Sequence, residues 1–461
     1  MELINSHINL PIFLRLPSFL RWKYFFVFFS LGKGSLLNRT FYLFISLVFL
    51  SSAVFAQHSN IQVTSSATVG GSWTVSGSGT STLYTFTPSA DNANIQVSDI
   101  TSRLIGSGTT KGSVKLVTTN GTGTQVGNVN FVVGLTAANS GSSRYSLSVE
   151  SGGDIVVDGA ISLKGGANNS TNYGYDLDFS ASGNVLVNTS VNTEGMSYSS
   201  GTTITYSNGG TISLRALGYV KLGAEISSAG GQNMQSGYSS YGRGNGGDVS
   251  ISGAGGVTML GDVTSWNGYN GLSGYGTNGS ITLTSENTSV SSGGVNDGQV
   301  SGLLQGGDFE KSGAGIFVMK GSNPYKGSTT ISGGTIQLGS TNSIPTGSSL
   351  VLSGGEFRSA GFSNSFASIV LSANSTLRMG SGVHTLTFAS LGSFASGRTL
   401  TIEDWQGTYA SPGATGTAGR IVFTPTTSSA ILSQIKFNNS STGNIHTSIQ
   451  LGTKEIVAGN Q

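Results

Sequence analysis

Apolar residues recur with fixed internal spacing between Leu147 and Ile281. Successive copies of the pattern start 30, 35, 37 and 32 residues apart. In each copy apolar residues follow the first at offsets two, eight, ten and fourteen, and only the stretch after offset fourteen changes length. The four full copies are Leu147, Val149, Ile155, Val157, Ile161; Leu177, Phe179, Val185, Val187, Val191; Ile212, Leu214, Val220, Leu222, Ile226; and Val249, Ile251, Val257, Met259, Val263.

An offset of two places residues on the same side of a β-strand. The pattern therefore predicts three short strands per coil, with two fixed corners and one corner that tolerates insertions. We expect an all-β chain built as a right-handed parallel β-helix, or β-solenoid, with its regular coils at residues 147–284.

Composition supports many tight corners and half-buried strands. The 461-residue chain has 71 Gly, and only 9% of its residues are charged, against roughly 25% in ordinary globular domains. Of the 22 Lys and Arg residues, five precede Ala56, whereas only one of the 20 acids does. The remainder is slightly acidic and shows no basic patch, so we expect no nucleic-acid partner.

Residues 1–56 are predicted to be an export signal. The apolar run Phe41–Leu50 follows Lys33 and Arg39, and the small residues Val54 and Ala56 place cleavage between Ala56 and Gln57. An uncleaved anchor is the alternative. The first 35 residues are interpreted either as an extended signal region or as the result of a start codon assigned too far upstream. We therefore expect the mature chain to be secreted or located at the cell surface after cleavage of the signal.

Residues 57–146 are rich in strand-type segments but out of phase with the coil pattern. The open end of a coil stack exposes unpaired strand edges, so we predict that this segment is a strand-rich N-terminal β cap. The stretch 95–283 resembles filamentous-haemagglutinin-like β-helical exoproteins, on the strength of a Gly-Asp-Ile phrase at Gly153–Ile155 followed by Ala160–Leu163.

After Leu283 the register fails, and residues 285–312 are interpreted as a Gly/Ser-rich joint. The following module, residues 313–461, opens with a motif similar to the autotransporter-associated β-strand repeat. The motif residues are Gly313, Gly315, Gly321, Asn323, Tyr325, Gly327, Thr329, Gly334 and Gly339, and the apolar positions of the motif are Phe317, Met319, Ile331, Ile336 and Leu338. We expect Asn323 to make an internal ladder or corner hydrogen bond, and Tyr325 to pack inside.

This resemblance implies a secreted surface passenger of a Gram-negative-type cell. Self-transporting passengers end in an outer-membrane barrel, but this sequence ends KEIVAGNQ. We therefore expect an outer-membrane transporter on a separate chain, other secretion machinery, or a longer parent protein.

Candidate catalytic groups are few. The chain has no Cys and four scattered His, so thiolate chemistry and Cys-ligated zinc are excluded. The carboxylates Asp154 with Asp158 and Asp176 with Asp178 build no acidic row across coils. Glu225 and Asp262 stack in adjacent coils, but no basic partner for them is obvious from the sequence. We predict no enzyme, no catalytic residue, no metal and no cofactor. A polysaccharide-cleaving β-helix enzyme stays as an alternative.

The variable corner carries the candidate ligand ridge. Its four insertions, residues 162–176, 192–211, 227–248 and 264–280, leave the same corner of successive coils. They are rich in Gly, Ser and Asn and carry the aromatic residues Tyr173, Tyr175, Tyr198, Tyr206, Tyr238, Tyr241, Trp266, Tyr269 and Tyr275. Such composition is typical of antibody contact loops. The sequence predicts an adhesin-like protein that binds a cell-surface glycan or protein, with a ligand-free spacer or surface fibre as the alternative.

Overall fold

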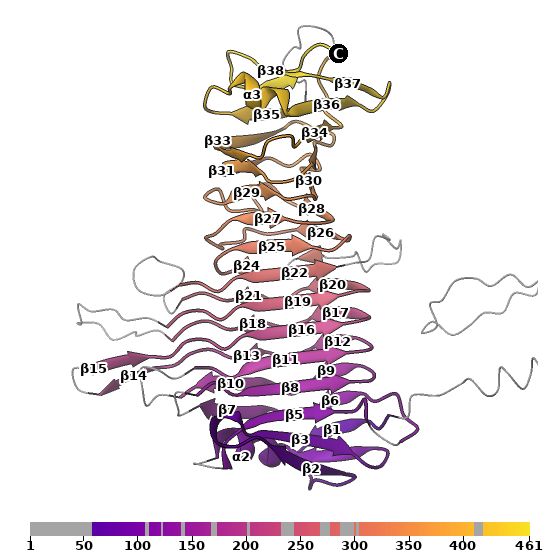
Figure 1. Cartoon of the computed structure of the whole chain (residues 1–461), viewed down its shortest axis with the longest axis vertical. Coiled ribbons are helices and arrows are strands. Elements are labelled where there is room, and N and C mark those ends of the chain that lie inside the picture. The colour runs from indigo at the N-terminus through magenta and orange to yellow at the C-terminus, as the bar shows by residue number, and fades with distance from the viewer. Residues whose placement is uncertain are drawn as a thin grey trace, which may run out of the picture. The chain divides into compact units, whose positions relative to one another are not determined.

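The chain passes through three parallel sheets in rotation, and we call each rotation a coil. A computed structural model describes residues 58–106, 110–120, 123–139, 143–166, 173–200, 203–231, 244–267, 277–285, 299–300, 304–409 and 418–461. A representative coil runs from β8 (Ser146–Ser151) in the first sheet through β9 (Ile155–Val157) in the second to β10 (Ile161–Gly165) in the third. It then returns to the first sheet at β11 (Asp176–Ala181), directly beside β8. Figure 1 shows the resulting stack, with the first sheet toward the viewer.

Within the described residues, fourteen strands form the first sheet. Besides β8 and β11 they are β2 (Gly71–Ser76), β3 (Leu83–Pro88), β5 (Ser113–Val117), β16 (Ile212–Ala216), β19 (Val249–Gly253), β22 (Ile281–Ser285), β25 (Phe309–Ser312), β27 (Thr329–Ile331), β29 (Ser349–Leu352), β31 (Asn364–Leu371), β33 (His384–Phe394) and β35 (Gly419–Phe423).

In the same part of the chain, the second sheet has 15 strands and the third has six. Besides β9 the second contains β1 (Ile61–Thr64), β4 (Ala93–Gln96), β6 (Val129–Phe131), β12 (Val185–Val187), β17 (Tyr219–Leu222), β20 (Gly256–Met259), β23 (Gln299–Val300), β26 (Ile316–Met319), β28 (Thr335–Leu338), β30 (Glu356–Arg358), β32 (Ser375–Arg378), β34 (Leu400–Glu403), β36 (Ile435–Asn439) and β37 (Asn444–His446). Besides β10 the third contains β7 (Leu135–Asn139), β13 (Val191–Asn192), β18 (Ile226–Ser227), β21 (Val263–Thr264) and β24 (Leu304–Gln305).

The register predicted from the apolar pattern is confirmed in all three sheets. Leu177 pairs with Leu147 and Ile212 in the first sheet. The residues at offset eight pair in the second sheet, and those at offset fourteen pair in the third. All the residues of the pattern are buried, so the inward positions form one continuous core. The prediction of an all-β chain with long parallel sheets is confirmed.

The coils begin earlier than the predicted start at residue 147. The strands β5, β6 and β7 pair in register with β8, β9 and β10. The predicted cap of residues 57–146 therefore ends too late, because a full coil lies at Ser113–Asn139. The sequence pattern missed this coil because residues 118–128, which connect its first two strands, are longer than the equivalent residues 152–154.

The N-terminal end of the stack is closed by a mixed cap. The cap contains the antiparallel pair β2 and β3, the parallel pair β1 and β4, and the helix α2 (Val97–Ile105), which was not predicted. One face of α2 buries Ile100 and Leu104 against the end of the core. Because the last turn of this helix covers the interior, the cap shields the apolar end of the stack from water.

The predicted joint at residues 285–312 is wrong. The strands β23, β24 and β25 lie in this stretch and continue the second, third and first sheets. The register fails in the sequence because residues 286–298 are inserted between the first and second strands of the coil. This insertion lies outside the described residues, and the strands on either side of it remain in the stack.

From β25 onward the coils have two strands instead of three. The third sheet ends at β24, and the partners Phe309, Thr329, Leu350 and Ile369 of successive coils are 20, 21 and 19 residues apart. The C-terminal end is closed by α3 (Ser429–Ser433) and the antiparallel pair β38 (Ser448–Gln450) and β39 (Ile456–Ala458).

Replacing Val187 with Asp tests the interior register. Val187 is fully buried in β12 and pairs with Val157 and Leu222, so a carboxylate there would need to be desolvated without a partner. We expect the variant to lose about 3–5 kcal/mol of stability and to unfold several coils together, as measured by thermal melting followed by circular dichroism.

The matched control is Leu186→Asp in the same strand. The Leu186 side chain points outward, so this variant should melt close to the wild type. Equal melting temperatures for the Val187 variant and the wild type would show that the proposed register is wrong.

Candidate functional site

The repeat motif lies where three-strand coils give way to two-strand coils. Its apolar residues Phe317, Met319, Ile336 and Leu338 point inward from β26 and β28 and are fully buried. The motif glycines Gly313, Gly321 and Gly334 have φ values of 73°, 73° and 62°. These glycines form the tight turns between strands, because a side chain is strained in that left-handed region.

Asn323 ends the third sheet. Its side-chain Oδ1 accepts the backbone N–H of Leu304, the first residue of β24, at 2.9 Å, and its Nδ2 donates to the Ser343 carbonyl at 2.7 Å. Asn323 is buried, so these bonds satisfy backbone groups that another third-sheet strand would otherwise pair. The predicted internal hydrogen bond of Asn323 is thus present, and the side chain links its own coil to the coils before and after it.

Tyr325 is packed in the interior beside this turn. Its ring lies 5.7 Å from the ring of Phe309, and its hydroxyl contacts Thr329 Oγ1 at 2.5 Å. Thr329 in turn contacts Ser348 Oγ at 2.8 Å. The motif residues Tyr325 and Thr329 therefore form, with Ser348, a buried chain of hydroxyl groups across the junction.

Lys311 is a buried charge that the sequence pattern did not indicate. It occupies the inward position two residues after Phe309 and is fully buried. Its Nζ donates to the carbonyls of Ser312, Gly313 and Gly333 at 2.5, 2.7 and 3.2 Å. The ammonium thus holds the turn carbonyls of two neighbouring coils. The sequence could have indicated this position, because Lys311 pairs with the inward Leu283 of the preceding coil.

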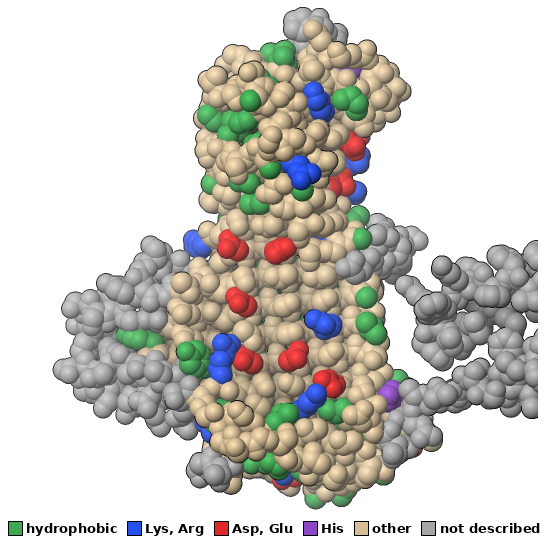
Figure 2. Space-filling model, viewed as in Figure 1, with side chains coloured by type: hydrophobic (Ala, Val, Ile, Leu, Met, Phe, Trp, Pro, Cys, Tyr) green, Lys and Arg blue, Asp and Glu red, His purple; other side chains and the backbone are tan. Residues whose placement is uncertain are grey.

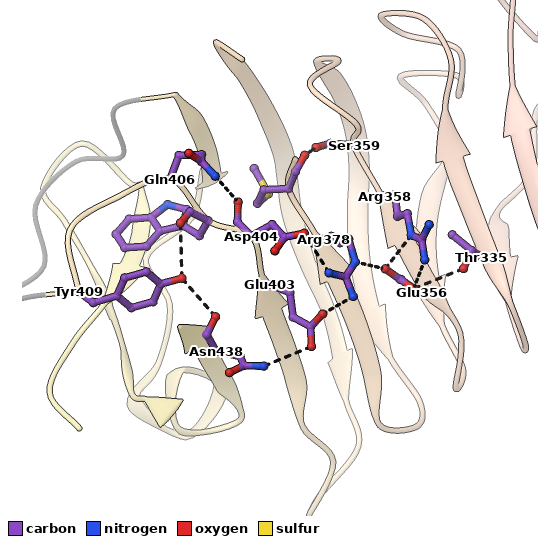
Figure 3. Close-up of polar contacts among 12 residues, drawn as sticks. Thr335, Glu356, Arg358, Ser359, Arg378, Glu403, Asp404, Gln406, Tyr409 and Asn438 are labelled. Carbon is purple, nitrogen blue, oxygen red and sulfur yellow. Dashed lines mark hydrogen bonds and ion pairs between the residues drawn. The ribbon is translucent and has the colours of Figure 1, made fainter. Parts of the chain in front are cut away.

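An ion network lies outside the two-strand coils (Figure 3). Arg378 contacts Glu356 at 2.6 Å, Asp404 at 2.9 Å and Glu403, so that three neighbouring strands are connected. Burial alone would raise the pKa of Glu356, but hydrogen bonds and charges from Arg358 and Arg378 outweigh that effect and lower it. Because Glu356, Glu403 and Asp404 all pair with Arg378, the network connects the strands of the outer face.

Three of the four insertions of the variable corner are closed at their roots by hydrogen bonds. At offset sixteen, Thr193, Ser228 and Ser265 are buried, and their hydroxyls donate to the carbonyls of Gly210, Gly247 and Gly279 at 3.0, 2.7 and 2.8 Å. The N–H groups of the same glycines donate back to the three carbonyls. These paired bonds return the chain to the first sheet whatever the length of the insertion.

The aromatic residues of the predicted ridge do not share one environment. Tyr173 and Tyr206 are half-buried in the described roots, and Trp266 is also half-buried. Tyr198 lies in the hairpin β14 (Ser197–Ser200) and β15 (Thr203–Tyr206), which projects from the stack beside β13 (Figure 1). Tyr238, Tyr241, Tyr269 and Tyr275 lie outside the described residues, as do Ala56 and Gln57.

The assignment of Tyr175 to the ridge is wrong. Tyr175 is fully buried, and its hydroxyl donates to the Leu104 carbonyl of α2 at 2.9 Å. The physical reason is strand parity, because Tyr175 lies two residues before the inward Leu177 and therefore shares its side of the strand.

Most of the paired carboxylates hold neighbouring coils together. Asp154 accepts the N–H and side chain of Asn184, and Asp158 accepts the side chain of Asn188. Asp176 accepts the N–H and hydroxyl of Thr211 and pairs with Arg144 at 2.6 Å. Asp178 is exposed. Three of these four acids are therefore occupied by structural contacts.

Beside the ridge roots, Glu194, Glu225 and Asp262 form an acidic column across three coils. Glu194 pairs with Lys164 at 3.1 Å and accepts Ser227 Oγ at 2.6 Å, and the pKa of Glu194 is lowered because these contacts outweigh its burial. Burial raises the pKa of Glu225, and the charges of Glu194 and Asp262 raise it further. The basic partner Lys164 was not predicted from the sequence.

Within the described ranges, no helix has both the length and the apolar character needed to cross a membrane. In the same part of the chain, no three acidic or histidine side chains gather closely enough to hold a metal ion.

Replacing Asn323 with Ala tests its role at the junction. The change leaves a buried N–H of Leu304 and a buried carbonyl of Ser343 without their partners, and each unsatisfied group costs about 1–3 kcal/mol. We expect a loss of roughly 2–5 kcal/mol in chemical denaturation, with Asn444→Ala as the control because Asn444 is exposed. Equal denaturation midpoints for both variants would contradict the role assigned to Asn323.

Replacing Glu225 with Gln tests the acidic column. A raised pKa means that the folded state binds the proton more tightly than the unfolded state, so stability falls as pH rises through that pKa. Since Glu225 is exposed, we expect the variant to be more stable than the wild type by no more than about 1 kcal/mol at pH 7.5, with no difference near pH 4. Glu194→Gln should instead be less stable than the wild type at pH 7.5, because the pKa of Glu194 is lowered in the folded state. Destabilisation by Glu225→Gln at that pH would contradict the assignment.

Residues 309–338 match the family model described as passenger-associated-transport-repeat. Comparisons with curated proteins and with solved structures found no match. The repeat points to an autotransporter passenger domain, to secretion or a cell-surface location, and to association with an outer-membrane transporter domain. The chain therefore carries the autotransporter-associated repeat that was predicted from its Gly, Asn and Tyr spacing.

Proposed function

We propose that this chain is a right-handed parallel β-helical passenger that acts as an adhesin-like protein through its corner ridge. The observation that carries the proposal is the pair of reciprocal hydrogen bonds that Thr193, Ser228 and Ser265 each make with a glycine at the root of three ridge insertions. We call each such pair of bonds a clamp. The clamp separates the length and sequence of an insertion from the register of the core, so the insertions are free to vary for recognition. The stack supplies rigidity and the ridge supplies contacts.

The composition of the ridge supports recognition of a cell-surface glycan or protein. Tyr and Trp give large amphipathic contact areas at low entropic cost, and Ser, Gly and Asn adapt their hydrogen bonds. The Tyr206 hydroxyl and the Trp266 indole N–H have no hydrogen-bond partner among the described residues. Both groups lie at the base of the ridge, where a ligand or a neighbouring insertion would satisfy them.

Export completes the proposal. The signal at residues 1–56 would direct the chain out of the cytoplasm and be cleaved between Ala56 and Gln57. An outer-membrane transporter, or other secretion machinery, would carry the passenger to the surface of a Gram-negative-type cell.

We propose a non-enzymatic role for the passenger. Asp154, Asp158 and Asp176 each accept hydrogen bonds from the next coil, which supports a structural role for these carboxylates. The ion network around Arg378 is likewise internally paired.

Shortening the hairpin β14–β15 tests the ridge. Ser197 pairs with Tyr206, so replacing residues 198–205 with Asn-Gly should close a two-residue turn on that pair while leaving the Thr193 clamp intact. We expect the variant to fold like the wild type and to lose on the order of tenfold in adhesion to whole cells and immobilised glycans.

The control is an Asn-Gly replacement of residues 440–443, between the paired residues Asn439 and Asn444 of β36 and β37. This turn is far from the ridge in the stack, so adhesion should be unchanged. Full adhesion by the shortened hairpin variant would show that this part of the ridge is not the contact site, and a wild-type protein that binds nothing would favour the spacer.

A further inference from the structure

A shallow pocket of about 440 Å³ lies on the outer face of the first sheet. It is formed by outward side chains of β8, β11 and β16, which are consecutive strands of the sheet. Its polar lining includes Glu150, Asp176, Asp178, Ser180, Ser213 and Arg215. Figure 2 shows this face toward the viewer, with scattered acidic and basic groups and almost no hydrophobic side chains in its middle.

Two charged groups of the pocket are free to bind. Glu150 pairs with Lys115 at 2.6 Å, and Asp176 pairs with Arg144. In the described part of the chain, Asp178 and Arg215 have no hydrogen bond or ion pair, and both are exposed. Asp178 lies opposite Ser213, and Arg215 lies opposite Ser180, so the carboxylate and the guanidinium face the same space diagonally across two strands.

These groups complement each other chemically. A carboxylate offers only acceptors, and a guanidinium offers five donors in a fixed fork. A ligand that carries both donors and acceptors on neighbouring atoms can bond to both groups at once. The hydroxyls of Ser180 and Ser213 lie between them and can donate or accept.

Hydroxyl groups continue from the pocket along the stack. Ser213, Ser250 and Thr282 are partners in successive strands and point outward. A second column beyond Arg215 contains Ser252, Thr284 and Ser312. Neighbouring strands are about 4.8 Å apart, so a linear polymer lying along either column would meet a new hydroxyl at each coil.

The chemistry of this face disfavours other classes of partner. The outward positions of the described first-sheet strands from β8 to β27 carry no aromatic or aliphatic side chain, whereas the centres of protein interfaces are usually built on such anchors. Among the described residues of this face, the acids Asp178, Asp248, Asp308 and Glu310 outnumber the single unpaired cation, Arg215. Their charges would repel nucleic acid and uronate polymers.

We propose that the outer face of the first sheet binds a neutral polysaccharide chain that lies across successive coils. Asp178 and Arg215 anchor one sugar unit, and the serine and threonine columns accept the following units. This site is distinct from the corner ridge, because its anchors Asp178 and Arg215 lie in the strands β11 and β16 and not in the insertions.

The test is binding of the purified protein to an array of polysaccharides. The neutral probes are amylose, dextran, mannan, xylan, laminarin and cellulose, and the acidic probes are polygalacturonate and heparin. We expect the wild type to bind at least one neutral polymer, and Asp178→Ala combined with Arg215→Ala to weaken that binding at least about tenfold. Lys221→Ala, on the outer face of the second sheet, should bind like the wild type.

Circular dichroism confirms folding of the double variant, which replaces only exposed side chains. The variant with the shortened β14–β15 hairpin should bind the neutral polymer normally, which separates this site from the ridge. The proposal is overturned if no neutral polymer binds, if only the acidic polymers bind, or if the double variant binds as tightly as the wild type.

Discussion

A fixed parallel register between neighbouring coils is the constraint on which the rest of the structure depends. A slip of one residue in any strand would turn its buried side chains outward, because side chains alternate along a strand. Corner side chains reinforce the register. Asn128 accepts the N–H of Asp154, Asp154 accepts the N–H of Asn184, and Asn184 accepts the N–H of Tyr219. Each link spans one coil, so the corners and the core specify the same alignment.

This constraint explains where the chain can vary. Insertions are tolerated where a coil turns from one sheet to the next, provided that the chain re-enters at the same position. At the variable corner, buried hydroxyls such as Ser228 fix that position through a reciprocal bond with a glycine. At the junction, Asn323 ends a whole sheet while the other two continue. The surface can therefore change from coil to coil without disturbing the interior.

Most of the fold could be predicted from the sequence because the buried residues of each coil recur at the same offsets along the chain. Where the offsets are constant, from Leu147 to Val263, every predicted pairing is present. Where a connection lengthens, as at residues 118–128, the offsets shift and the pattern no longer reveals the coil, although Val114 and Val129 pair in register.

The candidate site was harder to predict for physical reasons. Asn323 bonds the backbone of Leu304 in the last strand of the third sheet. Leu304 lies 19 residues earlier in the sequence, so the sequence around Asn323 does not reveal this partner. Lys311 is buried only because carbonyls of two coils converge on it. Tyr175 was grouped with the ridge by composition, whereas its strand parity places it inside. The diagonal pair Asp178 and Arg215 depends on the alignment of two strands and cannot be read from either strand alone.

Disulfide trapping in this cysteine-free chain tests the register most directly. Ser250 and Thr282 are partners on adjacent strands, about 4.8 Å apart, and this separation is within the range that a disulfide spans. The account predicts that the Ser250→Cys/Thr282→Cys variant forms an intramolecular disulfide on mild oxidation, and that Ser250→Cys/Thr284→Cys does not. Equal cross-linking of the two variants, or cross-linking of the second alone, would contradict it.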